Sequence, residues 1–142
     1  DQVRQLQQAE EAIGARIGQV RSRSRDHWTA PWGFSAPTVF LNRALLVTTA
    51  LESGAVLDQC LAIEGAMGRI RSSDGAVGSR LIDIDILVVG QRILHTPQLV
   101  VPHPRLHQRR FALAPLCDLL PGWVHPQQGR TALDLLNALG VA

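Results

Sequence analysis

Residues 81–89 of this 142-residue chain read LIDIDILVV, an apolar stretch that two aspartates interrupt. Its β-branched residues predict a strand. Because side chains alternate along a strand, Asp83 and Asp85 are expected on one face, with Cα atoms about 6.5–7 Å apart. The opposite face would then carry Ile82, Ile84 and Ile86. The sequence therefore predicts a strand with one apolar and one acidic face.

The acidic face allows two interpretations. Two neighbouring carboxylates repel each other and are costly to bury unless a cation neutralises them. Hard oxygen ligands in this arrangement suit Mg²⁺, which usually takes one or two carboxylates and completes its shell with water and substrate phosphates. The alternative is an amphipathic edge strand with Asp83 and Asp85 in solvent, and this stretch alone does not decide between them.

Basic residues flank the acidic pair on both sides, and they favour a polyphosphate site because guanidinium groups bind phosphate oxygens. They are Arg69, Arg71, Arg80, His103, His107, Arg109 and Arg110. For each arginine taken singly, a surface ion pair is the alternative. His103 and His107 could hold zinc if they lay on a helix, but the prolines on either side of His103 argue against a helix there.

The composition excludes several classes of protein. The chain is 46% hydrophobic and 18% charged, with a net charge of +2, which indicates one globular domain and no nucleic-acid partner. All 14 basic residues are arginines and tyrosine is absent, so a Schiff-base lysine or a tyrosine acid–base group is excluded. No membrane span and no signal peptide are expected, which predicts a cytoplasmic protein. Cys60 and Cys117 lack the spacing of a zinc site or disulfide framework.

Hydrophobic periodicity predicts a mixed α+β chain with a mainly antiparallel sheet. Ser53 and Thr131 are expected to cap helices, the latter with Asp134 in the capping-box position. The residues expected to point inward from the second helix are Val56, Leu57, Cys60, Leu61 and Met67. The predicted helices cover 2–17, 54–68, 111–120 and a short segment after Thr131, and the predicted strands cover 19–28, 39–50, 81–89 and a hairpin of 93–94 with 99–101.

Two loops are expected to serve ligands. Residues 29–38 combine proline, glycine and apolar side chains without a strand to pack them, which predicts a binding loop. Residues 72–79, SSDGAVGS, can bury little of their own, which predicts a lid that is mobile until ligands bind. The aromatic residues expected mainly in the core are Trp28, Trp32, Phe34, Phe40 and Phe111, although Trp32 and Phe34 lie in the first of these loops and could stack on a flat ring.

These motifs resemble the 6-hydroxymethyl-7,8-dihydropterin pyrophosphokinases of folate biosynthesis, which move a pyrophosphoryl group from ATP to a pterin. The resemblance extends over roughly residues 1–140 in one register. Its most specific part is RLIDIDIL at 80–87, followed by Val-Pro-His at 101–103. The other matching stretches are Ile63-Glu64, Gly68-Arg69-Ile70-Arg71, Arg109-Arg110-Phe111, Pro31-Trp32-Gly33 and Phe40-Leu41-Asn42.

The resemblance also implies roles for individual residues. Asp83 and Asp85 would hold two Mg²⁺ ions that bridge the ATP phosphates, and with Arg69 and Arg80 they would form the catalytic group. The ATP-binding residues would be Glu64, Arg69, Arg71, Arg80, Ile86, His103 and Arg109. The pterin-binding residues would be Thr29, Trp32, Gly33, Phe40, Asn42 and Phe111, with Asn42 reading the ring edge and Phe111 stacking on the ring.

The family resemblance further implies a ferredoxin-like three-layer α+β sandwich with helices on both faces of the sheet. Residues 1–142 are expected to form a single pterin pyrophosphokinase-like domain and a monomer. The family's first strand precedes its first helix, so this strand is expected to be missing from the sequence given. Two alternatives stay open: another Mg²⁺-dependent phosphotransferase on the same scaffold, and a non-catalytic paralogue that binds pterin or nucleotide.

Overall fold

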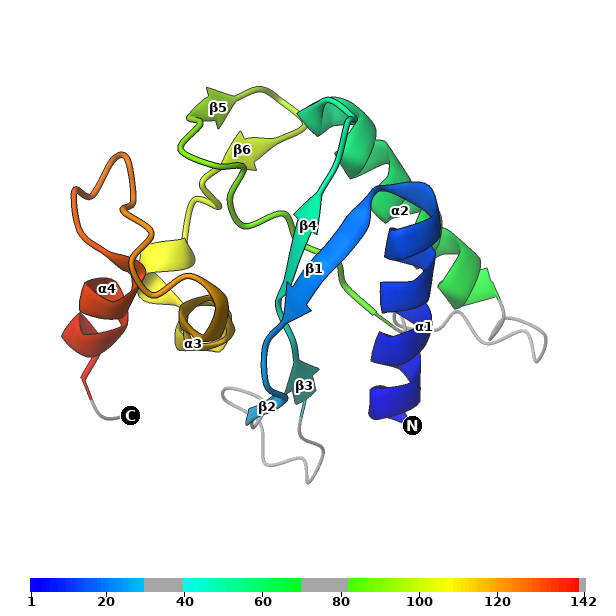
Figure 1. Ribbon diagram of the computed structural model, residues 1–142, viewed down its shortest axis with the longest axis horizontal. Coiled ribbons are helices and arrows are strands. Elements are labelled where there is room, and N and C mark those ends of the chain that lie inside the picture. The colour runs from blue at the N-terminus through cyan, green and yellow to red at the C-terminus, as the bar shows by residue number, and fades with distance from the viewer. Residues whose placement is uncertain (30–39, 70–81, 141–142) are drawn as a thin grey trace. The chain divides into compact units, whose positions relative to one another are not determined.

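The computed structural model describes residues 1–29, 40–69 and 82–140, without the side chain of Arg69 (Figure 1). The chain divides into two compact units. Unit 1 comprises Asp1–Arg21 and Val47–Ile86, and unit 2 comprises Ser22–Leu46 and Leu87–Ala142. The single domain expected over 1–142 stays a prediction.

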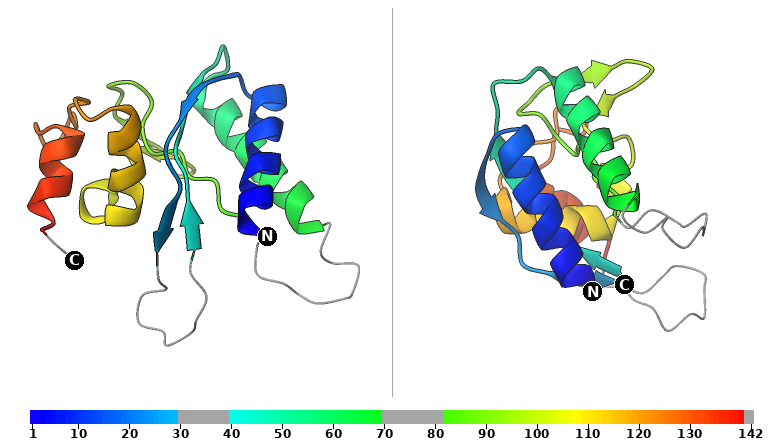
Figure 2. Two further views of the ribbon diagram at one scale, coloured as in Figure 1. Left: turned by 60° about the horizontal axis from the view of Figure 1, so that its bottom comes forward. Right: turned by 90° about the vertical axis from the view of Figure 1, so that its right-hand side faces the viewer.

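Unit 1 is built on two helices, α1 (Gln2–Arg16) and α2 (Ser53–Arg69), which pack side by side (Figures 1 and 2). The Asp1 carboxylate accepts hydrogen bonds from the backbone N–H groups of Val3 and Arg4, and so caps α1. The helix expected over 2–17 is confirmed. Ala9 and Ile13 are the buried residues of α1, and Ile17, the C-cap residue of this helix, is buried as well.

The inward face of α2 differs in part from the expected one. Cys60, Ile63 and Met67 are buried, at intervals of three and four residues. Leu61 was expected on this face, but its side chain is 51% exposed, so that prediction is wrong. Each residue turns the helix by about 100°, so Leu61 cannot share the face of its neighbour Cys60. Ile63 takes the inward position instead.

Gly18 follows α1 and lies against Thr48, the last residue of β4 (Leu45–Thr48), and both Gly18 and Thr48 belong to unit 1. A β-carbon added at Gly18 would overlap the carbonyl oxygen of Thr48 and lie 2.9 Å from its carbonyl carbon. Both are backbone atoms, so neither can rotate away as a side chain could. Glycine is therefore required for this close approach.

Gly18→Ala is expected to destabilise the fold by about 1–3 kcal/mol, because the backbone of α1 or β4 must shift to admit the methyl group. Gly14→Ala is the matched control, since a β-carbon there meets nothing within 4 Å. That change should stabilise α1 by up to about 1 kcal/mol through helix propensity. Denaturant unfolding of both variants measures the contrast. Equal stability of the two variants would contradict the close-approach explanation.

The strands form small two-stranded sheets, and the mixture of helices with antiparallel strands confirms the α+β class. β2 (His27–Thr29) pairs antiparallel with β3 (Phe40–Asn42), and β1 (Gln19–Arg23) pairs with β4. The segment 39–50, expected as one strand, therefore contains two strands. Between them Ala44 donates its backbone N–H to the Ser24 hydroxyl at 2.8 Å, which takes this amide out of a regular ladder.

The expected hairpin near residue 95 is confirmed. β5 (Leu94–His95) pairs antiparallel with β6 (Val100–Val101). Thr96 closes the turn, since its hydroxyl accepts from the backbone N–H of Leu99 at 3.0 Å. This hairpin belongs to unit 2, as do the remaining helices: the 3₁₀ helix η2 (Leu106–Gln108), α3 (Arg110–Leu119) and α4 (Ala132–Ala138).

The core of unit 2 lies where α3, α4 and η2 pack together. Its buried residues are Leu106, Leu113, Leu116, Trp123, Ala132 and Leu135. Thr131 caps α4, because its hydroxyl accepts from the backbone N–H of Asp134 at 3.0 Å, as the sequence predicted. The indole N–H of Trp123 donates to the carbonyl of Gly90 at 2.8 Å, so the buried ring leaves no unpaired donor.

Residues 82–89 are not a strand in the part of the chain that the structure describes, so the prediction of a strand over 81–89 is wrong there. Two backbone groups of this segment have partners outside any ladder. The N–H of Ile84 donates to the carboxylate of Glu64 at 2.6 Å, and the carbonyl of Leu87 accepts from the N–H of His103 at 2.8 Å. The β-branched sequence favours an extended segment, but only a neighbouring strand would make it part of a sheet.

Candidate functional site

Asp83 and Asp85 lie on one side of the segment 82–86, which belongs to unit 1. Asp83 and Asp85 are exposed, whereas Ile82 is buried and both Ile84 and Ile86 are half-buried. The predicted alternation of an acidic and an apolar face is therefore confirmed, although the segment belongs to no sheet among the described residues. This arrangement leaves both carboxylates accessible to a ligand from solvent.

Glu64 holds the backbone between the two aspartates. It lies on α2 with a residue exposure of only 8%. Its Oε2 accepts the backbone N–H of Ile84 at 2.6 Å, a short charge-assisted hydrogen bond. The resemblance implied that Glu64 contacts ATP, whereas in this structure its carboxylate binds the chain's own backbone. This bond ties the acidic segment to α2 within unit 1.

Cys60 lies one helical turn before Glu64. Burial raises the pKa of its thiol to about 11, and the negative charges of Glu64 and Asp85 add to the effect. The thiol is therefore neutral near pH 7 and is a poor nucleophile. Cys60 and Cys117 are both free thiols in the structure.

The donor set of the acidic segment fits Mg²⁺ better than a softer metal. Asp83 and Asp85 offer hard carboxylate oxygens, and proteins usually hold Mg²⁺ with one or two carboxylates together with substrate phosphates. Within residues 1–29, 40–69 and 82–140, no group of three or more histidine, cysteine or acidic side chains could hold a metal ion. The His107 ring packs edge-on against His125, with centroids 6.1 Å apart.

A polar and aromatic cluster forms on the strand pair of unit 2. The register pairs His27 with Asn42 and Thr29 with Phe40, so these four side chains share one face of the pair. The Asn42 amide Nδ2 donates to the Thr29 hydroxyl at 3.0 Å. The Phe40 residue is 53% exposed. Three of the residues expected to bind pterin are thus brought together.

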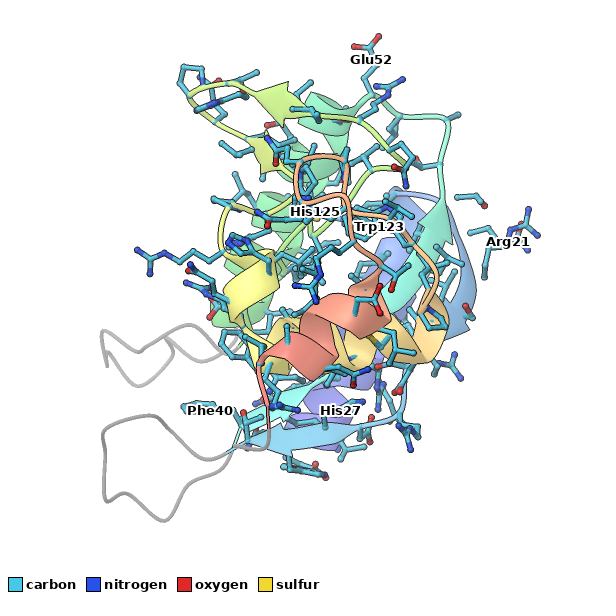
Figure 3. The ribbon with its side chains drawn as sticks, turned by 90° about the vertical axis from the view of Figure 1, so that its left-hand side faces the viewer. Arg21, His27, Phe40, Glu52, Trp123 and His125 are labelled. Atoms are coloured by element: carbon cyan, nitrogen blue, oxygen red, sulfur yellow. The ribbon has the colours of Figure 1, made fainter. Side chains whose placement is uncertain are left out.

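The aromatic residues are more exposed than expected. Trp28 is 51% exposed and Phe111 is 43% exposed, so the prediction that Trp28, Phe40 and Phe111 lie mainly in the core is wrong. The core of unit 2 is filled mainly by leucines, which explains why these rings are not needed there. Figure 3 shows Phe40 and His27 on the strand pair.

Phe111 lies in the first turn of α3, and the expected ATP-binding residue Arg109 directly precedes this helix. The Arg109 guanidinium carbon lies 5.5 Å from the centroid of the Phe111 ring, within the range of a cation–π contact. His103 Nδ1 accepts from the backbone N–H of Arg105 at 3.4 Å.

Several predicted site residues lie outside the described residues. They are Trp32, Gly33, Arg71, Arg80 and the side chain of Arg69. The predicted lid over 72–79 and nearly all of the predicted binding loop over 29–38 lie outside them as well. These predictions stay as the sequence made them.

One polar cluster was missed by sequence reasoning. Asp118, near the end of α3, accepts hydrogen bonds from Arg25 and His27. The partners are separated by more than 90 positions, and no local motif marks them. The sequence signal for such a contact is the opposite charge of Asp118 and its partner. Because the chain contains 14 arginines, this signal does not select Arg25.

The mixed helices, small antiparallel sheets and exposed acidic pair describe an α+β protein with a candidate divalent-cation segment. Residues 1–121 match the model of the 7,8-dihydro-6-hydroxymethylpterin-pyrophosphokinase (HPPK) family. The chain belongs to this family.

Individual relatives agree with the family match. The chain is 39% identical over 125 residues to a protein of Porphyromonas gingivalis named 2-amino-4-hydroxy-6-hydroxymethyldihydropteridine pyrophosphokinase, covering 86% of this chain and 84% of the relative. It is 36% identical over 143 aligned positions to a protein of the same name from Methylorubrum extorquens, covering 99% and 89%. A Synechocystis protein of that name is 34% identical over 130 positions, covering 91% and 64%. Separately, none of the helices in the described residues has the length and hydropathy to cross a membrane.

Proposed function

We propose that this protein transfers a pyrophosphoryl group from ATP to 6-hydroxymethyl-7,8-dihydropterin and releases AMP, a step of folate biosynthesis. The observation that carries this proposal is the HPPK family match over residues 1–121. In the reaction the hydroxymethyl oxygen attacks the β-phosphorus, the bond from that phosphorus to the oxygen of the α-phosphate breaks, and the hydroxyl proton is released. Such a displacement depends on positioning and charge more than on a nucleophilic side chain.

The acidic segment supplies the proposed metal ligands. Asp83 and Asp85 hold two Mg²⁺ ions, which when bound neutralise phosphate charge. The exposure of both carboxylates and their common side support this role. Glu64 keeps the segment in place from α2. Arg69 and Arg80 complete the catalytic group by stabilising the charge that develops on the phosphates.

The remaining assignments concern the two substrates. The ATP-binding residues are Glu64, Arg69, Arg71, Arg80, Ile86, His103 and Arg109. The imidazole of His103 and the guanidinium of Arg109 are groups that hydrogen-bond to phosphate oxygens. The pterin-binding residues are Thr29, Trp32, Gly33, Phe40, Asn42 and Phe111. The half-exposed rings of Phe40 and Phe111 support stacking against a flat heterocycle.

The proposal also covers the architecture, the number of domains, the oligomeric state and the cellular location of the protein. We propose the ferredoxin-like three-layer sandwich of a single domain, and the mixed α+β content supports it. A monomer and a cytoplasmic location are also proposed.

One assay separates the proposed reaction from its alternatives. The protein is mixed with Mg²⁺, ATP and 6-hydroxymethyl-7,8-dihydropterin, and the nucleotide products are separated. AMP formed in step with the pterin diphosphate supports pyrophosphoryl transfer. ADP would indicate a different phosphotransferase. Binding of both substrates without any product would indicate the non-catalytic paralogue.

Asn42→Ala is expected to weaken pterin binding by about 1–3 kcal/mol, because ring donors that face a lost amide stay unpaired. Binding of an ATP analogue should change little. Calorimetry with each ligand measures the two Kd values. Asn137→Ala makes the same chemical change at an exposed site on α4 and should leave both values unchanged. An equal loss for both ligands in Asn42→Ala would indicate misfolding and contradict a specific contact.

A further inference from the structure

The Asp118 carboxylate joins the segment that leads into β2 to the last turn of α3, entirely within unit 2. Its Oδ2 accepts from the backbone N–H of Arg25 at 3.1 Å, and its Oδ1 accepts from the Arg25 Nη2 at 2.9 Å. The His27 Nε2 lies 2.8 Å from Oδ2. Both carboxylate oxygens are therefore occupied by partners from residues 25–27. The Asp118 side chain is only 14% exposed, so solvent competes weakly for these bonds.

The two elements that Asp118 joins carry different parts of the predicted pterin site. His27 begins β2 and shares its face with Thr29 and with Asn42 of the neighbouring strand. Phe111 lies in the first turn of α3, the helix that ends near Asp118. α3 packs against both β2 and β3. The core residues Leu113 and Leu116 anchor the middle of this helix, and Asp118 adds a direct polar bond from its last turn to the strand pair.

The electrostatics keep this tie in place over the ordinary pH range. Hydrogen bonding from the Arg25 side chain, assisted by His27 and by the Arg25 backbone, holds the pKa of the Asp118 carboxyl well below its usual value, against the opposing effect of burial. A carboxyl with a lowered pKa stays ionised, and its stabilising effect is lost only in strong acid. The Asp118 carboxylate therefore accepts these hydrogen bonds at every pH above the strongly acidic range.

The two partners do not contribute equally. The Arg25 side chain is 81% exposed, and ion pairs made by exposed groups contribute little because water and salt screen them. The His27 side chain is 21% exposed, and it lies on the strand itself. The hydrogen bond from His27 to Asp118 therefore contributes more to holding β2 against α3. Arg25 mainly lowers the pKa of the Asp118 carboxyl and so keeps it ionised.

We propose that Asp118 is a positioning residue of the pterin site, which fastens β2 to α3 and thereby sets Thr29 and Asn42 relative to Phe111. This role rests on the proposed function. Asp118 touches no substrate in this assignment and acts only through the two elements that it joins. Because Arg109 is the only residue of the proposed ATP set that directly adjoins α3 along the chain, loss of the tie should weaken pterin binding more than ATP binding.

The test is the pair of dissociation constants measured by calorimetry on the full chain for 6-hydroxymethylpterin and for Mg²⁺ with α,β-methylene-ATP. Asp118→Ala is expected to raise the pterin Kd about tenfold and the nucleotide Kd less than about twofold. Asp118→Asn keeps one acceptor oxygen and should fall between the unaltered protein and Asp118→Ala. His27→Ala should resemble Asp118→Ala, while Arg25→Ala should change the pterin Kd less than about threefold.

Asp26→Ala is the matched control. Asp26 forms an ion pair with Arg43 at 2.8 Å, next to the same strand pair, but it makes no bond to α3. The control thus removes a carboxylate and an ion pair from the strand pair and leaves the link to α3 intact. Its pterin Kd should stay within about twofold of the unaltered protein. A pterin Kd raised as much by Asp26→Ala as by Asp118→Ala would overturn the positioning role.

Two further outcomes would also overturn it. One is an unchanged pterin Kd in Asp118→Ala and in Asp118→Asn. The other is an equal loss of affinity for both ligands, which would indicate general destabilisation. If Asp118→Ala fails to fold, Asp118→Asn and His27→Ala decide the matter by the same comparison. Failure of the unaltered protein to bind any pterin would overturn the proposed function together with the positioning role, a result distinct from all of these.

Discussion

Replacing Asp83 or Asp85 by alanine is expected to abolish pyrophosphoryl transfer while the fold persists. Each change removes one of the two hard ligands of the proposed Mg²⁺ pair, and the loss of an electrostatic group of this kind typically costs at least about a hundred- to a thousandfold in rate. Both side chains are exposed, so the stability of the protein without ligands should change by no more than about 0.5 kcal/mol. Removing one of two like charges could even raise it slightly.

The experiment combines a rate with a binding measurement. AMP formation is followed at saturating substrates, and Mg²⁺ with α,β-methylene-ATP is titrated while the thermal midpoint is recorded. A ligand that binds only the folded protein raises this midpoint, so a lost metal site appears as a lost shift. Asp58→Ala is the control, because it removes an exposed carboxylate of α2 in the same unit. Full activity of either aspartate variant would refute the metal assignment.

Glu64→Ala is expected to cause the second largest effect, a loss of both stability and nucleotide binding. The Glu64 carboxylate accepts the Ile84 N–H at 2.6 Å, and its removal leaves that amide without this acceptor, which costs about 1–3 kcal/mol. The same bond fixes the backbone between Asp83 and Asp85. Without it, both carboxylates lose their fixed spacing, so the affinity for Mg²⁺ with α,β-methylene-ATP should fall.

Glu64→Gln distinguishes the hydrogen bond from the charge. The glutamine carbonyl can still accept the Ile84 N–H, so most of the stability should return, measured by denaturant unfolding. Glu52→Ala, at an exposed position just before α2, controls for the loss of one negative charge. If Glu64→Gln were as unstable as Glu64→Ala, the contribution would come from the charge of Glu64 and the proposed backbone tie would be wrong.

The resemblance and the structure differ most informatively at Glu64. The residue was expected among the ATP contacts because of its place in a motif. Its geometry adds a second role, since the carboxylate is buried and engaged with Ile84. A motif records which residues accompany a reaction, but it does not distinguish a group that touches substrate from one that holds a neighbour in place.

The sequence by itself determined the local features. The periodicity of 2–17 predicts α1, Thr131 with Asp134 predicts the start of α4, and the alternation of 82–86 predicts which side the aspartates take. The motifs identified the family. All of these depend on contacts within a few residues, where backbone geometry and side-chain type leave few alternatives.

Only the tertiary structure decided which distant groups meet. The partners of Asp118 lie 93 and 91 positions away, and Glu64 accepts from an amide 20 positions later. The same holds for the absence of strand pairing in residues 82–89 and for the exposure of the Phe111 ring. The physical reason is that a hydrogen-bond donor bonds to any suitable acceptor that packing brings within about 3 Å. Packing depends on the whole set of side chains that fill the core, and no local period encodes it.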